Sequence, residues 1–204
     1  GKSQRRITDN LGFKGETVIT KGVGVFNYIP QPAYTQKKEV RNYFYVGRFV
    51  EVKNLKFLIS VFNELPQYSL YMAGFGEQEK ELKELSKENI HFLGTIDNKK
   101  LSAIYQQMDV FVLPSKVEPW GLVVEEALNN GIPVIVSDRV GCAEEIINNS
   151  NGLIFHYNDK NEFVQFMDFV IGVKVVLHNI KSDEMIINLQ NALADNGVLF
   201  NFIR

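Results

Sequence analysis

The chain has 204 residues, of which 45% are hydrophobic, and its formal net charge is -2 at pH 7. This length and apolar content suffice for a domain with a substantial core, and the mixed charge argues against a nucleic-acid or anionic-membrane surface. The single cysteine, Cys142, excludes an internal disulfide framework and a cysteine-based zinc site, and it suits the cytoplasm. These residues contain neither an apolar run of the roughly 18 residues that a transmembrane helix needs nor a signal-peptide pattern.

The opening of the chain has too little pattern for a core of its own. Residues 1–16 predict a short polar helix with Ile7 and Leu11 on one face, and residues 17–20 predict a brief strand. Residues 28–36, with two prolines and no periodicity, are typical of a linker. We interpret this opening as the end of something larger.

From Asn42 onward, apolar runs of strand length alternate with helical patterns. The predicted strands are residues 43–46, 68–73, 91–93, 110–113, 133–136 and 152–157, and the predicted helices are 55–64, 77–87, 98–108, about 121–128 and 162–170. This alternation implies right-handed crossovers and a parallel sheet covered on both faces. It predicts a doubly wound, Rossmann-like α/β domain over residues 41–170, with a ligand at the carboxyl edge of the sheet. Residues 171–204 stay unassigned, although 174–177 have strand features and 186–193 have helix features.

The most informative stretch runs from residue 110 to residue 138, where strand, loop, helix, turn and strand follow one another. The loop delivers the free N–H groups of Gly121, Leu122 and Val123 to the carboxyl end of a parallel strand. Backbone N–H groups at a helix N-terminus favour an anion, so this stretch predicts a phosphate site.

Glu118 and Glu126 stand on either side of this helix start. Glu126 lies one turn below Leu122, roughly 5 Å along the axis and away from the apolar stripe of the helix. From there a carboxylate can accept hydrogen bonds from both hydroxyls of a ribose attached to the phosphate. In the alternative interpretation both are solvated surface carboxylates, since the adjacent Glu125 lies equally far from the core face.

Two cations follow the first predicted strand. Arg48 and Lys53 are placed to converge on a diphosphate, Arg as a planar fork and Lys as a mobile point charge. The alternative is a loop arginine and a surface lysine paired with Glu51. A lysine in the first turn of a helix opposes the helix dipole, which favours the ligand role.

Gly74, Phe75 and Gly76 follow the second predicted strand, but Glu79 stands where a dinucleotide fingerprint needs a glycine, so a nicotinamide cofactor is not supported. The two glycines either let the backbone pass close to a ligand or make a turn. The three histidines are scattered, and none has the spacing of a metal ligand. We therefore expect neither a metal nor a cofactor.

Taken together, these stretches resemble the C-terminal half of the retaining, group 1 glycosyltransferases of GT-B fold. The resemblance covers roughly residues 43–170, and its most specific part is EPWGLVVEEAL, the Glu-x7-Glu motif of the family, formed here by Glu118 and Glu126. GRFVEVKNL is similar to the Gly-Arg…Lys phosphate loop of the family. Four further stretches match in the family's order: YMAGFGEQEKEL, IHFLGTIDNKKLSAIYQQMDVFVLPS, NGIPVIVSD and NGLIF.

The resemblance implies transfer of a sugar, with retention of anomeric configuration, from a nucleotide-sugar such as a UDP- or GDP-sugar to a hydroxyl acceptor. No divalent metal is implied, because cations and helix-end amides stabilise the departing diphosphate. Glu118 is implied to contact the donor sugar near the reacting centre, and Glu126 to bind the ribose. The implied diphosphate contacts are Arg48, Lys53, Gly121, Leu122 and Val123. The implied contacts to the base or sugar are Gly74, Phe75 and Leu93.

Three positions depart from the pattern of the family. Phe75 stands where an acidic residue is usual, Cys142 replaces the second of two glycines, and Glu144 stands where a proline is common. These departures concern the base and sugar contacts rather than the diphosphate clamp.

Members of the family carry a second Rossmann domain of similar size ahead of this one, with the acceptor site. We expect residues 1–25 to be a remnant of the end of that missing N-terminal domain, 26–40 the interdomain linker, and 171–204 a C-terminal tail. Such a fragment would bind nucleotide weakly and be inactive alone, since transfer needs both substrates positioned across the interdomain cleft.

The resemblance further implies a saccharide or lipid-linked saccharide acceptor, met through the missing domain, in polysaccharide or glycoconjugate biosynthesis. We expect a cytoplasmic location, peripheral at the inner membrane face. Two alternatives remain open: a GT-B-type sugar-nucleotide epimerase domain and a non-catalytic nucleotide-binding module.

Overall fold

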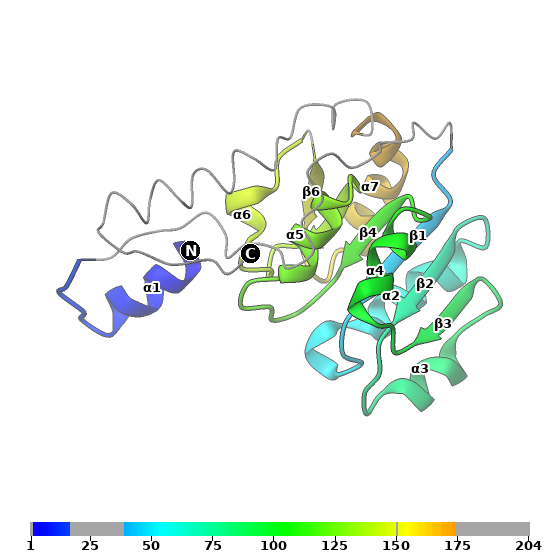
Figure 1. The fold of residues 1–204 in the computed structure, drawn as a ribbon, viewed down its shortest axis with the longest axis horizontal. Coiled ribbons are helices and arrows are strands. Elements are labelled where there is room, and N and C mark those ends of the chain that lie inside the picture. Colours follow the sequence, from blue (N-terminus) through cyan, green and yellow to red (C-terminus); the bar gives the residue numbers. More distant parts are fainter. Residues whose placement is uncertain (1, 17–38, 150, 174–204) are drawn as a thin grey trace.

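A computed structural model of the chain describes residues 2–16, 39–149 and 151–173 (Figure 1). Its strands are β1 (Asn42–Val46), β2 (Ser69–Ala73), β3 (Ile90–Gly94), β4 (Val110–Leu113), β5 (Val134–Ser137) and β6 (Gly152–Phe155). Its helices are α1 (Lys2–Asn10), α2 (Leu55–Glu64), α3 (Glu79–Leu85), α4 (Asn98–Tyr105), α5 (Leu122–Asn129), α6 (Ala143–Ile146) and α7 (Lys160–Val173), with a 3-10 turn, η1 (Glu51–Lys53), before α2.

The strands form one six-stranded sheet in the order β3-β2-β1-β4-β5-β6, and every neighbouring pair is parallel. This is the doubly wound Rossmann order, which confirms the predicted fold. The order reverses between β1 and β4, so the topological switch point lies between these two strands. The predicted strand 17–20, linker 28–36 and tail segments 174–177 and 186–193 lie outside the described residues.

Helices cover both faces of the sheet. Tyr43 and Phe44 are neighbours in β1 and therefore point to opposite faces. The Tyr43 ring meets Phe62 of α2 at 5.2 Å between centroids, and its hydroxyl donates to the Met167 carbonyl of α7 over 3.2 Å. The Phe44 ring meets Tyr105 of α4 at 5.1 Å. Thus α2 and α7 lie on one face of the sheet and α4 lies on the other.

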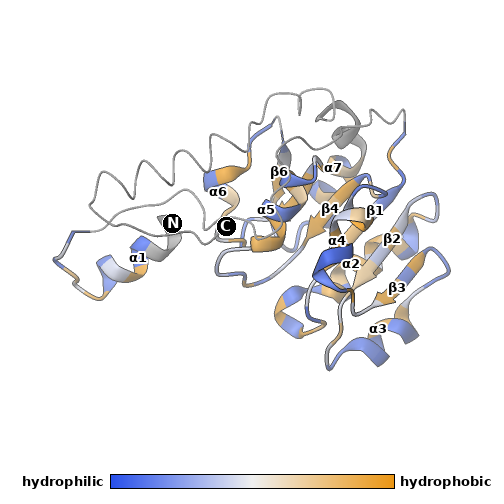
Figure 2. Cartoon of the chain, in the orientation of Figure 1, coloured by the Kyte–Doolittle hydropathy of each residue, from blue (hydrophilic) through white to orange (hydrophobic). Residues whose placement is uncertain are grey.

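The burial of the two central strands explains why their sequence pattern is so clear. All four residues of β4 (VFVL) and all four of β5 (VIVS) are buried. Strands buried on both faces have continuous apolar runs rather than alternation, which is the pattern visible in the sequence. In Figure 2 the hydrophobic colouring gathers on the strands, whereas α3 is mostly hydrophilic.

The ends of the helices were predicted less well than the strands. The predicted helix 162–170 instead spans Lys160–Val173. It begins earlier because the Asp159 carboxylate accepts a hydrogen bond from the Glu162 N–H over 2.9 Å, as an N-cap does. The predicted helices 77–87 and 98–108 are shorter in the structure, as α3 and α4.

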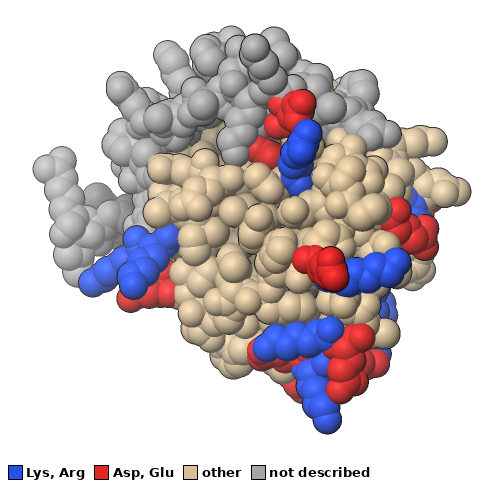
Figure 3. All heavy atoms as spheres, turned by 90° about the vertical axis from the view of Figure 1, so that its right-hand side faces the viewer, with Lys and Arg blue, Asp and Glu red and all other residues tan. Residues whose placement is uncertain are grey.

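On the face shown in Figure 3, Lys and Arg side chains lie beside Asp and Glu rather than forming a patch of one sign. Among the ion pairs of the described residues are Lys83–Glu79 at 2.7 Å and Lys56–Glu81 at 2.6 Å. Such exposed pairs contribute little to stability. No helix in the described part of the chain is long and apolar enough to cross a membrane.

Two glycines after β2 let the β2–α3 loop lie against the β1–α2 loop. The Phe49 N–H donates to the Phe75 carbonyl over 2.8 Å. A Cβ on Gly74 would lie 1.9 Å from the Gly47 carbonyl oxygen, and one on Gly76 would lie 2.3 Å from the Phe49 oxygen. The glycines therefore allow one backbone segment to approach another, which is a role the sequence did not specify.

We predict that Gly76→Ala lowers the free energy of unfolding by about 3 kcal/mol, because the added methyl group forces the two loops apart. Gly94→Ala is the matched control. A Cβ there meets nothing within 4 Å, and only the φ of +67° opposes it, at about 1 kcal/mol. Urea unfolding monitored by circular dichroism measures both losses. Equal losses would contradict the role of Gly76 in the loop contact.

Candidate functional site

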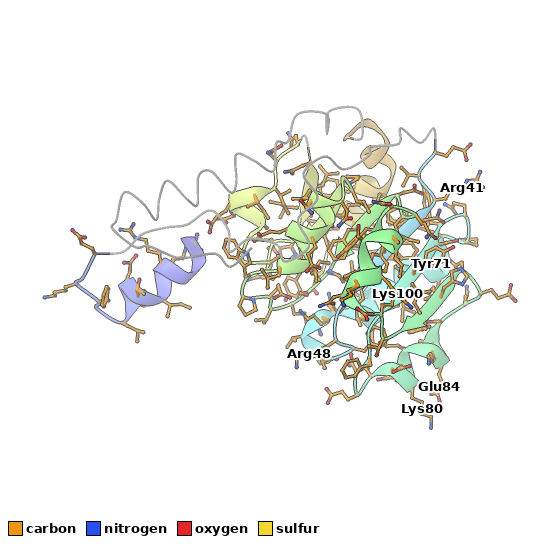
Figure 4. The ribbon with its side chains drawn as sticks, in the orientation of Figure 1. Arg41, Arg48, Tyr71, Lys80, Glu84 and Lys100 are labelled. Carbon is orange, nitrogen blue, oxygen red and sulfur yellow. The ribbon has the colours of Figure 1, made fainter. Side chains whose placement is uncertain are left out.

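The loops that follow several strands are joined by hydrogen bonds at the carboxyl edge of the sheet. The Lys116 N–H, after β4, donates to the Val52 carbonyl, after β1, over 2.8 Å. The Gly141 N–H, after β5, donates to the Glu118 carbonyl over 2.8 Å. In Figure 4, Arg41 and Arg48 lie at opposite ends of β1, with Arg48 at the carboxyl end. The predicted site residues of these loops therefore share one edge of the sheet.

Lys53 and Glu118 form an ion pair at this edge, in which Lys53 Nζ donates to Glu118 Oε2. Only 14% of each side chain is exposed, so the interpretation of Glu118 as a solvated carboxylate is wrong. The alternative pairing of Lys53 with Glu51 is also wrong, since Glu51 pairs with Lys116. Lys53 ends η1 and precedes α2, because Asn54 adopts a left-handed conformation (φ +58°) that separates the two. The helix-dipole argument for Lys53 therefore does not apply.

Tyr45 lies near both Glu118 and Arg48. The buried Tyr45 hydroxyl donates to the Arg48 carbonyl over 2.9 Å. Burial raises the pKa of Tyr45 far above its usual value, the Glu118 carboxylate raises it further, and the Arg48 guanidinium lowers it. The phenol therefore stays protonated and keeps donating, and it lies close enough to both charges to be influenced by each. The guanidinium of Arg48 itself is exposed.

The start of α5 has the geometry expected of an anion site. Gly121 precedes the helix with φ +102° and ψ +55°, and its carbonyl accepts from the Val124 N–H over 2.8 Å. A Cβ on Gly121 would lie 2.9 Å from the Val140 side chain, so only glycine fits here. The N–H groups of Leu122 and Val123 belong to the first turn, where no intrahelical acceptor exists.

Glu126 lies one turn further along α5 and is half-buried. Burial raises the pKa of its carboxyl above the usual value, and the charge of Glu125 raises it further. The charge of Glu126 in turn raises the pKa of Tyr105, although burial of that phenol is the larger cause. The Tyr105 hydroxyl donates to the Val123 carbonyl over 3.3 Å. Glu126 therefore lies near a tyrosine that contacts the first turn of α5.

Glu125 is the clearest miss of the sequence analysis. It is 1% exposed, whereas we expected it to lie off the core like Glu126. Trp120 folds back over α5, and its Nε1 donates a hydrogen bond to the Glu125 carboxylate. The sequence feature that could have indicated this contact is a tryptophan and a glutamate five residues apart with a glycine between them, which is not a recognised pattern.

A cavity of about 480 Å³ lies beside Glu118, between α1 and the loops that follow β4 and β5. Its lining includes Ile7 of α1, Glu118, Arg139 and Gly141. Arg48, Lys53 and Glu126 are not among its lining residues. Of these four residues the sequence singled out only Glu118 as a site residue, and it indicated neither Arg139 nor the contribution of α1.

The predicted base or sugar contacts lie at the β2–β3 end of the same edge. Phe75 is 60% exposed and Leu93 is 39% exposed, each at or just after the end of its strand. Gly74 packs against Gly47 and donates to the Gly94 carbonyl over 2.8 Å. The side chains of Phe75 and Leu93 are therefore available to a ligand, whereas Gly74 contacts the backbone of neighbouring loops.

No group of three or more His, Cys, Asp or Glu side chains in the described ranges is arranged to hold a metal ion. Cys142 is buried, and burial raises the pKa of its thiol, so it is a neutral packing residue rather than a nucleophile.

The family described as "Glycosyl transferases group 1" matches residues 31–188, which is well over half of the chain. The chain belongs to the group 1 glycosyltransferases. This glycosyltransferase chain is 34% identical over 154 residues to the O-antigen biosynthesis glycosyltransferase WbnH of Escherichia coli, covering 74% of this chain and 43% of that protein. It is 33% identical over 147 residues to the sulfoquinovosyl transferase SQD2 of Arabidopsis thaliana, covering 70% of this chain and 28% of that protein.

Solved GT-B glycosyltransferase structures share the fold of this glycosyltransferase chain. TarM of S. aureus, in complex with fondaparinux, alpha-GlcNAc-glycerol and UDP, superposes with a TM-score of 0.73 at 20% identity, covering 99% of this chain and 43% of that chain. Anabaena Alr3699/HepE in complex with UDP and glucose gives a TM-score of 0.64 at 20% identity, covering 78% and 49%. The chain thus spans about two-fifths of the length of WbnH and TarM.

The raised pKa of Glu126 has a consequence for stability. A carboxyl with a higher pKa in the folded state destabilises that state when charged, and this cost disappears as the pH falls through the raised value. Glu126→Gln should therefore raise the thermal midpoint at pH 7, and the gain should shrink toward zero near pH ~4.

The matched control is Glu84→Gln on α3, whose side chain is 66% exposed and points away from the sheet (Figure 4). This exposed change should move the midpoint little at any pH. Differential scanning calorimetry between pH 4 and 8 compares the two variants. A lower midpoint of Glu126→Gln at pH 7 would contradict the prediction.

Proposed function

We propose that this chain is the donor-binding domain of a retaining glycosyltransferase, which binds a nucleotide-sugar such as a UDP- or GDP-sugar at the carboxyl edge of its sheet. The observation that carries the proposal is the contact between Lys53 and Glu118. It joins the loop after β1 to the loop after β4, across the switch point where doubly wound folds bind ligands.

In the proposed complex, the diphosphate contacts both cations and the start of α5. Arg48 offers a planar fork, Lys53 a mobile charge, and Gly121, Leu122 and Val123 their N–H groups. Cations and fixed N–H dipoles stabilise the negative charge that develops on the diphosphate when its bond to the sugar breaks. No metal ion is required for this step in the proposal.

The rest of the donor extends to either side of the diphosphate. The half-buried carboxylate of Glu126 accepts hydrogen bonds from the ribose hydroxyls, and this bonding would repay the cost of its burial. The transferred sugar lies by Glu118 and enters the cavity beside it. Phe75 and Leu93 offer exposed apolar surface to the base, and Gly74 supports the loop that carries Phe75.

The acceptor and the location complete the proposal. Because the chain spans about two-fifths of WbnH and TarM, we propose that a preceding N-terminal domain supplies the acceptor site. Residues 1–25 and 26–40 are then the end of that domain and its linker. The O-antigen role in the name of WbnH supports a saccharide or lipid-linked saccharide acceptor in polysaccharide biosynthesis. A cytoplasmic place at the inner membrane face is proposed from the resemblance alone.

Calorimetric titration of the chain with UDP, GDP and ADP tests the proposal. We expect one of the nucleotides to bind, and Arg48→Gln and Lys53→Gln each to weaken that binding about tenfold. This loss corresponds to one charge-assisted hydrogen bond to phosphate. Lys80→Gln is the matched control, because its side chain on α3 is 90% exposed and points away from the edge (Figure 4).

The outcomes separate clearly. If no nucleotide binds at millimolar concentration, this chain is not a donor-binding domain. If a nucleotide binds and Arg48→Gln or Lys53→Gln changes its affinity no more than Lys80→Gln does, that residue lies outside the site.

A further inference from the structure

Trp120 and Glu125 form a partly buried hydrogen bond between the loop and the helix of the proposed donor site. Trp120 packs against the core, and its Nε1 donates to the Glu125 carboxylate, which is 1% exposed. We infer that these two side chains are a positioning pair that fixes Glu118 relative to the first-turn N–H groups of α5. The inference deepens the proposed function and rests on it.

Stability alone gives little reason for this arrangement. Burying a carboxylate costs free energy, and apolar side chains of similar volume are often as stable or more stable in such places. Glu125 also lies in the first turn of α5, where its charge competes with any anion bound at the same N-terminus. The charge therefore gives donor binding no advantage, and the useful property of Glu125 is its acceptance of the indole hydrogen bond.

The hydrogen bond spans a glycine, Gly121, at which the loop enters α5. Gly121, with φ +102°, lies between Trp120 and α5. Before this glycine, the loop contacts the β5–α6 loop, since the Cys142 N–H donates to the Trp120 carbonyl over 2.9 Å. Rotation at Gly121 would move Glu118 relative to the helix N–H groups. The Trp120–Glu125 bond opposes that rotation, because it links the loop directly to α5.

Four variants test the pair. Trp120→Phe and Glu125→Leu remove the hydrogen bond, and each should weaken UDP binding, or binding of whichever nucleotide the wild type prefers, about fivefold. Glu125→Gln keeps an acceptor oxygen and should stay within about twofold of the wild type. The double variant Trp120→Phe/Glu125→Leu should bind no more weakly than the weaker single variant, because both remove the same interaction.

Tyr43→Phe is the control for a merely structural effect. It removes a buried hydrogen bond to Met167 on the α7 face, away from the carboxyl edge, and should lower the thermal midpoint without changing nucleotide affinity. Trp120 is the single tryptophan of the chain, so its indole N–H gives one NMR resonance that needs no assignment. This resonance should shift on nucleotide binding in the wild type and in Glu125→Gln.

The experiment distinguishes two failures. If the wild type binds no nucleotide, both the proposed function and the inference that rests on it are refuted. If the wild type binds and both Trp120→Phe and Glu125→Leu keep wild-type affinity, as Tyr43→Phe does, the positioning pair is refuted while the donor site stands. Additive losses in the double variant would also refute the pair.

Discussion

The ion pair between Lys53 and Glu118 is the contact on which the architecture of the site depends. The sheet order reverses between β1 and β4, and this switch point is where doubly wound folds bind ligands. Lys53 comes from the first of these loops and Glu118 from the second. The nearby hydrogen bond from Lys116 to the Val52 carbonyl holds the same two loops together through the backbone.

This pair also affects the electrostatics of the carboxyl edge before a ligand arrives. Both side chains are only 14% exposed, so solvent screens their attraction less than it screens exposed pairs. In the proposed function an arriving diphosphate must share Lys53 with Glu118, and the exposed Arg48 is the cation that is available without a rearrangement. Tyr45 fixes the backbone at Arg48 through its hydrogen bond and therefore keeps this cation at the edge.

The sequence predicted the sheet well because strands buried on both faces have continuous apolar runs, as in β4 and β5. It also predicted which loops lie together at the carboxyl edge, because the order of strands and helices decides which loops share that edge. It missed Glu125 because that burial depends on Trp120 reaching back across Gly121. It misplaced Lys53 because a single left-handed residue, Asn54, separates η1 from α2 without any change in periodicity.

The cavity beside Glu118 could not be predicted from the sequence, for a different reason. One wall comes from α1, near the start of the chain, and the other walls come from loops more than a hundred residues later. No local pattern encodes such a meeting. By contrast, the Gly74 and Gly76 positions were visible as glycines, and only the backbone they approach was hidden.

The combination of charges at this edge restricts what kind of ligand suits it. Glu118 and Glu126 flank one helix start and Glu125 is buried in its first turn, so the negative charge there would repel a simple phosphate. Arg48, Lys53 and the first-turn N–H groups would give no advantage to a neutral sugar. A ligand that carries phosphates and sugar hydroxyls in one molecule uses both sets, because phosphate oxygens accept from the cations and hydroxyls donate to the carboxylates of Glu118 and Glu126. Nucleotide-sugars have this composition, and for this reason the paired chemistry supports the donor-site proposal more strongly than any one residue does.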